Sequence, residues 1–212
     1  MKKQSLLTKP TLGTDADVIV FDLETNGLLN DATRIHCISL YSNETDKIES
    51  FNEEKYADNA KDLPMATNYS ITTALGWLEC ADYIIGHNII NFDIPVIKKL
   101  YPWFNPRGTV IDTLLLSKLY HPNLFDIDWI VDKKTGEKRR RFETLPLQLY
   151  GRHSLEAYGH RLGEYKGNFG KTTDWSEWSQ EMQDYCEQDV AVTTKLCDHF
   201  HPYLSGSKWN IR

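Results

Sequence analysis

Two carboxylates early in the chain have the spacing of a cation-binding pair. Asp22 and Glu24 are separated by one residue, so in extended backbone both side chains leave from the same side of a sheet. Two negative charges at one spot are unfavourable unless water or a cation joins them, and hard oxygen ligands suit Mg²⁺ or Mn²⁺. An isolated Asp-x-Glu pair is more often two turn carboxylates that face water.

Three further residues are candidates for the same site as this pair. Asp93 is expected at the start of a helix that directly follows a short apolar strand. Asp189 follows Tyr185 by four residues, which places the phenol and the carboxylate on one helix face, one turn apart. Because Tyr-x-x-x-Asp alone is a weak signal, the functional hypothesis depends on the ordered set of motifs.

The pattern of apolar and polar residues around these positions predicts a mixed α/β fold. An unbroken apolar run at Val18 to Phe21 stops at Asp22 and fits a central strand that is buried on both faces, carries Asp22 and Glu24 at its C-terminal end and leads into a turn. Polar clusters between the next two apolar segments indicate a hairpin, and two short apolar strands follow further along the chain. About five strands, with helices on the faces of the sheet, are expected at 18–21, 35–42, 46–51, 83–86 and 109–111.

Apolar spacing of three to four residues and terminal cap residues predict the helices. Asp112 or Thr113 is expected to cap one of them, and this role for Asp112 is favoured over that of a fifth metal ligand. The last helix is predicted to open at a capping box, Asp174 to Glu177, and to end before Pro202. The helices are expected at about 69–79, 93–100, 114–120, 154–162 and 174–199.

The composition excludes several classes of protein and several kinds of binding. Hydrophobic residues make up 41% and charged residues 25%, as in a globular domain, and no apolar run is long enough to cross a membrane. The net charge of −6 has the wrong sign for attraction of nucleic acid by the whole surface, so any such contact must be local. The cysteines, Cys37, Cys80, Cys186 and Cys197, form no CxxC pair and are expected to be reduced, mostly buried thiols without a disulfide-linked partner.

The ordered motifs resemble those of a known nuclease family. Asp22-x-Glu24, Asn88-x-x-x-Phe92-Asp93 and Tyr185-x-x-x-Asp189 resemble the three motifs of DnaQ-like (DEDD) 3′-5′ exonucleases, in the tyrosine-bearing DEDDy subclass. Further stretches look like the proofreading domain of T7-type phage family A DNA polymerases, and the resemblance covers roughly Asp17 to His199. These stretches are 111–114, 117–119, 153–157, 161–167 and 188–194.

The resemblance implies an RNase H-like fold and a phosphodiesterase that uses two Mg²⁺ or Mn²⁺ ions. It assigns Asp22 as the ligand that bridges both ions, and Glu24 with Asp189 to the ion that carries the nucleophilic water. Asp93 would bind the second ion, partly through water. Tyr185 would orient the attacking water, because a phenol with a pKa near ~10 is a poor general base.

Nucleic-acid contacts near the carboxylates are expected from two groups of residues. Beside the metal ligands, polar groups would bind the 3′-terminal sugar or phosphate, and apolar or aromatic groups would stack on its base; the alternatives are that Asn88 braces a turn and that Phe92 packs in the core. A basic run ending in Arg139, Arg140 and Arg141 would contact the backbone phosphates of a duplex or single strand near the site, or is simply a solvated loop or hairpin. The residues expected beside the ligands are Leu23, Thr25, His87, Asn88, Asn91 and Phe92.

The expected function is a 3′-5′ exonuclease that acts on single-stranded or frayed DNA ends and releases nucleoside 5′-monophosphates. Its expected partners are a single-stranded DNA 3′ end and a separately encoded phage-type DNA polymerase for which it proofreads, in the cytoplasm of a bacterial host. The open alternatives are an RNase D-like RNA 3′-end exonuclease and a non-catalytic nucleic-acid-binding or scaffold subunit of a replication complex. The domain organisation is expected to be an N-terminal arm at 1–16, the exonuclease domain at 17–200 and a C-terminal tail at 201–212.

Overall fold

The computed structural model describes residues 16–52, 70–164 and 174–205. Nearly all of the predicted N-terminal arm and most of the predicted tail lie outside these residues. Within them, no helix is both long and apolar enough to cross a membrane. Cys37, Cys186 and Cys197 are buried as predicted, whereas Cys80 is exposed.

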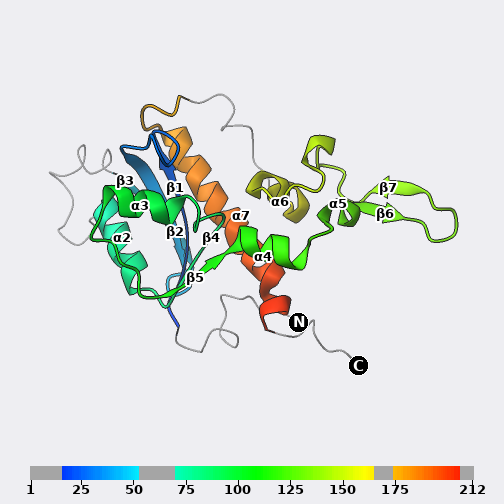
Figure 1. Ribbon diagram of the computed structural model, residues 1–212, viewed down its shortest axis with the longest axis horizontal. Coiled ribbons are helices and arrows are strands. Elements are labelled where there is room, and N and C mark those ends of the chain that lie inside the picture. The colour runs from blue at the N-terminus through cyan, green and yellow to red at the C-terminus, as the bar shows by residue number, and fades with distance from the viewer. Residues whose placement is uncertain (1–15, 53–69, 165–173, 206–212) are drawn as a thin grey trace.

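A five-stranded mixed sheet organises the fold, in the order β3-β2-β1-β4-β5 (Figure 1). The central strand β1 (Val18–Thr25) pairs antiparallel with β2 (Ile35–Ser42), which pairs antiparallel with β3 (Lys47–Asn52). On its other side β1 pairs in parallel with β4 (Tyr83–Gly86), and β4 pairs in parallel with β5 (Thr109–Asp112). The predicted strand number and the mixed sheet are therefore confirmed.

The central strand is longer than its apolar run indicates. It continues past Phe21 because β2 also pairs with the acidic segment, with Asp22 opposite Ser39 and Glu24 opposite Cys37. The pairing shifts register only between Glu24 and Thr25. The prediction that Asp22 and Glu24 lie in extended backbone at the C-terminal end of this strand is confirmed, and the strand itself continues to Thr25.

Alternation along β1 divides its side chains between two cores. Ile19, Phe21 and Leu23 pack in the cluster that includes α2 (Ile71–Cys80) and α3 (Asp93–Leu100). Val18 and Val20 pack instead with Val190 and Cys197 of the long helix α7 (Gln180–Leu204). Asp22 and Glu24 share the parity of Val18 and Val20, so their side chains are directed to the α7 face.

The long helix begins and ends later than predicted. Ser179 is its N-cap, and the Ser179 hydroxyl accepts a hydrogen bond from the Met182 amide at 3.1 Å. The Asp174 carboxylate instead accepts from the Ser176 amide at 2.9 Å in a turn outside the helix, so the predicted capping box is wrong. Pro202 lies within the last turn, and the helix ends at Leu204.

The remaining elements extend the molecule away from the sheet (Figure 1). Asp112 caps α4 by accepting from the Leu114 amide at 2.9 Å, as predicted, and Gly163 ends α6 in the left-handed conformation with φ 74°. The basic run forms a β-hairpin, one of the two forms expected for it. These elements are α4 (Thr113–Tyr120), α5 (Leu124–Ile127), β6 (Trp129–Val131), β7 (Lys138–Arg140), η1 (Leu147–Leu149) and α6 (Leu155–Leu162).

Candidate active site

Three carboxylates from distant parts of the sequence meet at the α7 face of the sheet. Asp22 and Glu24 come from β1 and Asp189 from α7, and one oxygen atom from each lies within 4.8 Å of the other two. Each side chain keeps some exposure, so an ion has access to the cluster. Carboxylate oxygens at this spacing match the hard ligands that Mg²⁺ and Mn²⁺ prefer.

Asp93 lies near this cluster, at the start of a different helix. It is the first residue of α3 and is 4% exposed. Hydrogen bonds from its own backbone amide and from the Leu23 amide stabilise its carboxylate and so oppose the rise in its pKa. Its negative charge in turn raises the pKa of both Asp22 and Glu24, which places it beside them although it lies outside the three-oxygen set.

Burial raises the pKa of all four carboxyl groups. Loss of hydration is the main cause that raises the pKa of Asp22 and Glu24 well above the usual range, and the charge of Asp189 adds to it. The same loss of hydration raises the pKa of Asp93 and of Asp189 to about 7. A divalent cation would replace these protons and remove the repulsion.

Tyr185 lies one turn before Asp189 on α7. Its hydroxyl forms a hydrogen bond with the Asp189 carboxylate, which lowers the pKa of that carboxyl group. Burial and the charges of Asp189, Glu24 and Asp22 raise the phenol pKa above its usual value. Tyr185 therefore stays protonated at neutral pH and can orient a ligand by its hydroxyl, but it cannot act as a general base.

Metal binding is expected to become tighter as pH rises to about 8. Below the pKa of about 7 shared by Asp93 and Asp189, the ion must displace protons, so the apparent affinity for Mg²⁺ falls. Isothermal titration calorimetry in two buffers with different ionisation enthalpies would detect the released protons. An affinity that does not change between pH 6 and about 8 would contradict these raised pKa values.

Three of the residues predicted to contact the terminal nucleotide have structural roles instead. Leu23 is 4% exposed and packs in the core, so its side chain cannot stack on a base as predicted. Phe92 is partly buried against the same core, and the Thr25 hydroxyl donates to the Gly27 carbonyl at 2.7 Å. Leu28, 75% exposed on the loop after β1, offers an apolar surface that the sequence prediction missed.

The residues after β4 have defined structural partners. His87 Nδ1 lies 2.9 Å from Thr113 Oγ1, and burial lowers the His87 pKa to about 4, so the ring is neutral. Asn88 has φ 68°, and its amide donates to Asp112 Oδ1 at 3.0 Å, while Asn91 Nδ2 donates to the Asn88 side-chain oxygen at 3.2 Å. These bonds support the interpretation that Asn88 braces the turn.

Lys99 of α3 fixes the loop that follows the acidic strand. Its ammonium group donates to the carbonyl oxygens of Leu29, Asn30 and Ala32 at 3.0, 2.8 and 2.8 Å. These three bonds use every proton of the group and tie the helix that carries Asp93 to the loop after Glu24. A lysine in the last turn of a helix is common, and nothing in its local sequence indicates this role.

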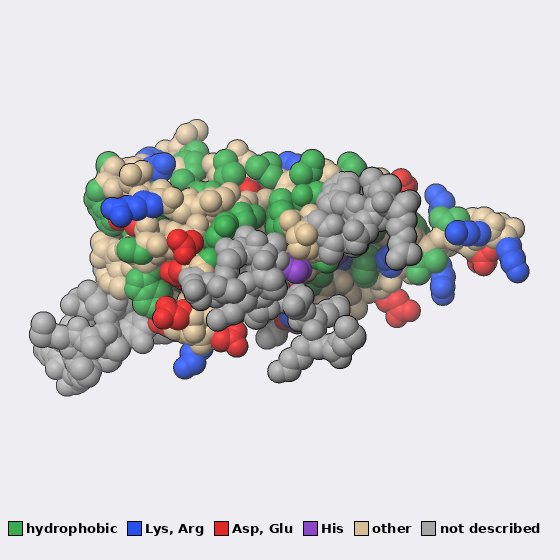
Figure 2. All heavy atoms as spheres, turned by 90° about the horizontal axis from the view of Figure 1, so that it is seen from below, with side chains coloured by type: hydrophobic (Ala, Val, Ile, Leu, Met, Phe, Trp, Pro, Cys, Tyr) green, Lys and Arg blue, Asp and Glu red, His purple; other side chains and the backbone are tan. Residues whose placement is uncertain are grey.

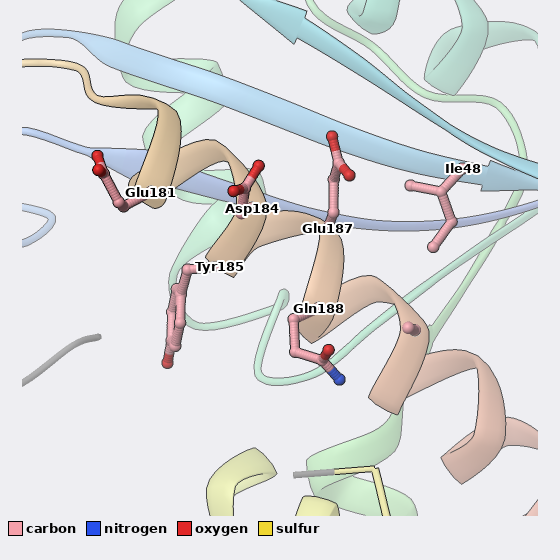
Figure 3. Close-up of a pocket in the computed structure, with 7 residues that line it drawn as sticks. Ile48, Glu181, Asp184, Tyr185, Glu187 and Gln188 are labelled. Carbon is pink, nitrogen blue, oxygen red and sulfur yellow. The ribbon is translucent and has the colours of Figure 1, made fainter. Parts of the chain in front are cut away.

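A hollow of about 540 Å³ lies along the exposed side of α7. Figure 3 shows Tyr185 and Gln188 directed to one side of the helix and Glu187 to the other. Three acidic side chains line this hollow, and they would repel the phosphates of a strand that passed along that side of α7. Its lining residues are Ile48, Glu181, Asp184, Tyr185, Glu187, Gln188 and Ala191.

The predicted arginine contacts do not lie at the carboxylate cluster. Arg139 and Arg140 belong to β7, and Arg141 follows it directly. The hairpin projects from the end of the molecule opposite the five-stranded sheet (Figure 1), and basic side chains mark the same end in the space-filling view of Figure 2. Any phosphate contact there is remote from the acidic site.

The fold and the acidic cluster define the class of protein. The chain belongs to the RNase H superfamily, whose family model matches residues 19–201. Among curated proteins it is similar to the DNA-directed DNA polymerase of Escherichia phage T7, with 32% identity over 202 residues, 85% of this chain and 26% of that polymerase. The corresponding polymerase of Enterobacteria phage T3 is 29% identical over the same shares of both chains.

These relatives confirm the resemblance to T7-type phage polymerases, and the chain spans about a quarter of their length. Solved structures support the fold. The chain is similar to Brucella melitensis NrnC bound to pGG, with a TM-score of 0.51 and 16% identity over 92% of this chain and 86% of that one. The family B DNA polymerase of Pyrobaculum calidifontis also gives a TM-score of 0.51, with 14% identity over 90% of this chain and 25% of that one.

Proposed function

We propose that this protein is a divalent-metal-dependent 3′-5′ exonuclease that acts on single-stranded or frayed DNA ends. The carboxylate cluster of Asp22, Glu24 and Asp189 in an RNase H superfamily fold is the observation that carries this proposal. The similarity to phage DNA polymerases supports DNA as the substrate and proofreading as the context. The proposed partner is therefore a separately encoded DNA polymerase whose products this protein would proofread.

The acidic residues would hold the ions, and the neighbouring residues would position the substrate. Asp22, Glu24 and Asp189 would be ligands of a pair of Mg²⁺ or Mn²⁺ ions, with Asp93 completing the set. Such a pair supplies an activated water and stabilises the charge that develops on the leaving 3′ oxygen. The protonated Tyr185 hydroxyl, which is hydrogen-bonded to the Asp189 carboxylate, would orient the attacking water beside it.

The direct test is shortening of an end-labelled single strand. Wild-type protein with Mg²⁺ is expected to release mononucleotides from the 3′ end, and a chelator should stop the reaction. Asp189→Asn is expected to lower the rate by roughly a thousandfold or more, because it removes a charged ligand. Asp184→Asn makes the same chemical change at an exposed position of α7 and serves as the matched control.

Matched substrates decide between the proposed function and its alternatives. Preferential degradation of an RNA strand of the same sequence would identify an RNA 3′-end exonuclease instead. Binding of the strand without shortening, in Mg²⁺ and in Mn²⁺, would identify a non-catalytic module. For the proofreading context, a primer with a mismatched 3′ end should be shortened faster than a fully paired one, because fraying supplies the single strand; equal rates would contradict proofreading.

A further inference from the structure

We infer that the face of the β6–β7 hairpin that carries Lys138 and Arg140 binds the sugar–phosphate backbone of DNA at a point remote from the carboxylate cluster. The inference rests on the proposed function only in taking a nucleic acid as the substrate. It adds a second contact site, which would make affinity depend on the length of the strand. The hairpin holds the densest run of positive charge in a chain of net charge −6.

Strand register sorts the charges of the hairpin between its two faces. Trp129 pairs with Arg140 and Val131 with Lys138, so these four side chains share one face. Ile130 pairs with Arg139 on the opposite face.

Among the paired residues of the hairpin and those that flank them, acidic side chains lie only on the face that carries Ile130 and Arg139. The Asp132 amide donates to the Glu137 carbonyl at 2.9 Å, which continues the pairing by one step. Asp132 and Glu137 line one hollow together with Ile130 and Arg139. The charge of Arg139 is therefore countered by two acidic neighbours, whereas Lys138 and Arg140 have none on their own face.

The cationic face combines charge with exposed apolar surface. Lys138 and Arg140 are exposed, and Val131 beside them is 48% exposed. The half-buried Trp129 ring lies 5.0 Å from the Tyr150 ring, which holds the base of this face against the body of the protein. Arginine and lysine next to apolar and aromatic groups are suited to phosphate and sugar contact, and a two-stranded ribbon also fits the major groove of a duplex.

A buried ion pair holds the hairpin in a fixed position. Asp128, just before β6, accepts from Arg161 Nε and a terminal nitrogen of Arg161 at 2.8 Å each, and the two side chains are 0% and 4% exposed. The Asp128 carbonyl also accepts from the Arg141 amide at 3.0 Å, so one residue anchors both strands. Rigid anchoring reduces the entropy that is lost when the hairpin binds a partner. A loop that only contacts solvent would not need such anchoring.

The position of the hairpin determines which part of a substrate it meets. It projects from the end of the molecule opposite the sheet whose central strand carries Asp22 and Glu24 (Figure 1). A strand held by its 3′ end at the carboxylates must therefore extend past α6 to reach Lys138. Short oligonucleotides would occupy the acidic site alone, whereas longer strands or duplexes with a 3′ overhang would occupy both sites.

The test compares DNA of different lengths in Ca²⁺, which supports binding without relying on turnover. The probes are fluorescent single strands of about six and about thirty nucleotides, and a duplex with a short 3′ overhang. Lys138→Ser with Arg140→Ser is expected to weaken binding of the long probes about tenfold and to lower the slope of log affinity against log salt by roughly one to two. Affinity for the short strand should not change. Comparison of the long strand with the duplex identifies which source of phosphate the hairpin binds.

Two single variants serve as controls for charge and for face. Arg139→Ser removes one cation from the acidic face and should have a smaller effect than Arg140→Ser, while Lys47→Ser at the exposed sheet edge should have none. Equal effects of Arg139→Ser and Arg140→Ser, or unchanged affinity for both long probes, would overturn the inference. Unchanged DNA affinity together with capture of an acidic protein would assign the face to a protein instead. Failure of the wild type to shorten the short strand in Mg²⁺ would contradict the proposed function alone.

Discussion

Asp22→Asn is expected to abolish nuclease activity and, at the same time, to make the metal-free protein more stable at pH 8. Asp22 is the proposed ligand at the centre of the acidic set, and the charges of Asp189, Asp93 and Glu24 all raise its pKa. Removal of its negative charge removes a ligand for the ions. The same change removes repulsion that the metal-free fold must otherwise tolerate.

The sign of the stability change follows from proton linkage. Burial raises the pKa of Asp22 in the folded state well above its unfolded value of about 4. The stability that its bound proton contributes is present in full below the unfolded pKa, and it is lost as pH rises toward the folded pKa. Asparagine does not titrate, so the variant does not undergo this loss, and its advantage should grow from pH 5 to about 8.

Two measurements made on the same preparations check this prediction. Thermal unfolding with a chelator should show a higher melting temperature for Asp22→Asn than for the wild type, and added Mg²⁺ should raise the wild-type value more than that of the variant. Strand-shortening assays should show a loss of roughly a thousandfold or more. Asp184→Asn should change neither quantity, and a less stable, inactive Asp22→Asn protein would indicate that Asp22 is a structural group instead.

Much of the fold follows from local pattern, as β1 shows. The apolar run predicts the central strand, and the two-residue spacing predicts that Asp22 and Glu24 share a side. The sequence does not say which helices cover that side. Because α7 rather than α2 or α3 packs there, Asp189 reaches the pair across more than 160 intervening residues.

The start of α7 shows why local cap signals can mislead. Asp174 has the spacing of a capping box, but Trp175 and Trp178 pack against the buried cluster of Cys37, Met182 and Cys186. That packing keeps residues 174–178 out of the helix, which begins only after Ser179. Tertiary contacts of large aromatic side chains thus outweigh a cap that contributes about 1 kcal/mol.

Long-range contacts that set the candidate site leave no local pattern. Lys99 binds backbone carbonyl groups about 70 residues earlier in the chain, and backbone acceptors are not encoded by side-chain type. The burial of Leu23 and the exposure of Leu28 likewise depend on how the loop after β1 folds back. The sequence motifs therefore predict the clustered carboxylates better than the residues that surround them.

Arg161→Met is expected to destabilise the folded protein by about 3–5 kcal/mol, because it leaves the Asp128 charge buried without its partner. Arg161 also donates to the carbonyl oxygens of Arg152 and Leu149, at 2.8 and 3.3 Å, and the Gly151 amide donates to Asp128 at 2.8 Å. One guanidinium thus joins α6 to the segments on both sides of η1. Chemical denaturation at pH 7 would measure the change in the free energy of unfolding.

A double variant separates the missing partner from the lost packing. Arg161→Met combined with Asp128→Asn removes the unpaired charge and should recover a substantial part of the loss, whereas Asp128→Asn alone should be costly because it leaves the arginine unpaired. Since Asp128 anchors both strands of the hairpin, the region of Lys133 to Arg141 in Arg161→Met should also be cleaved faster by trypsin. A stability loss below about 1 kcal/mol, with unchanged cleavage of the hairpin, would show that the hairpin is held by the Trp129 and Tyr150 packing instead.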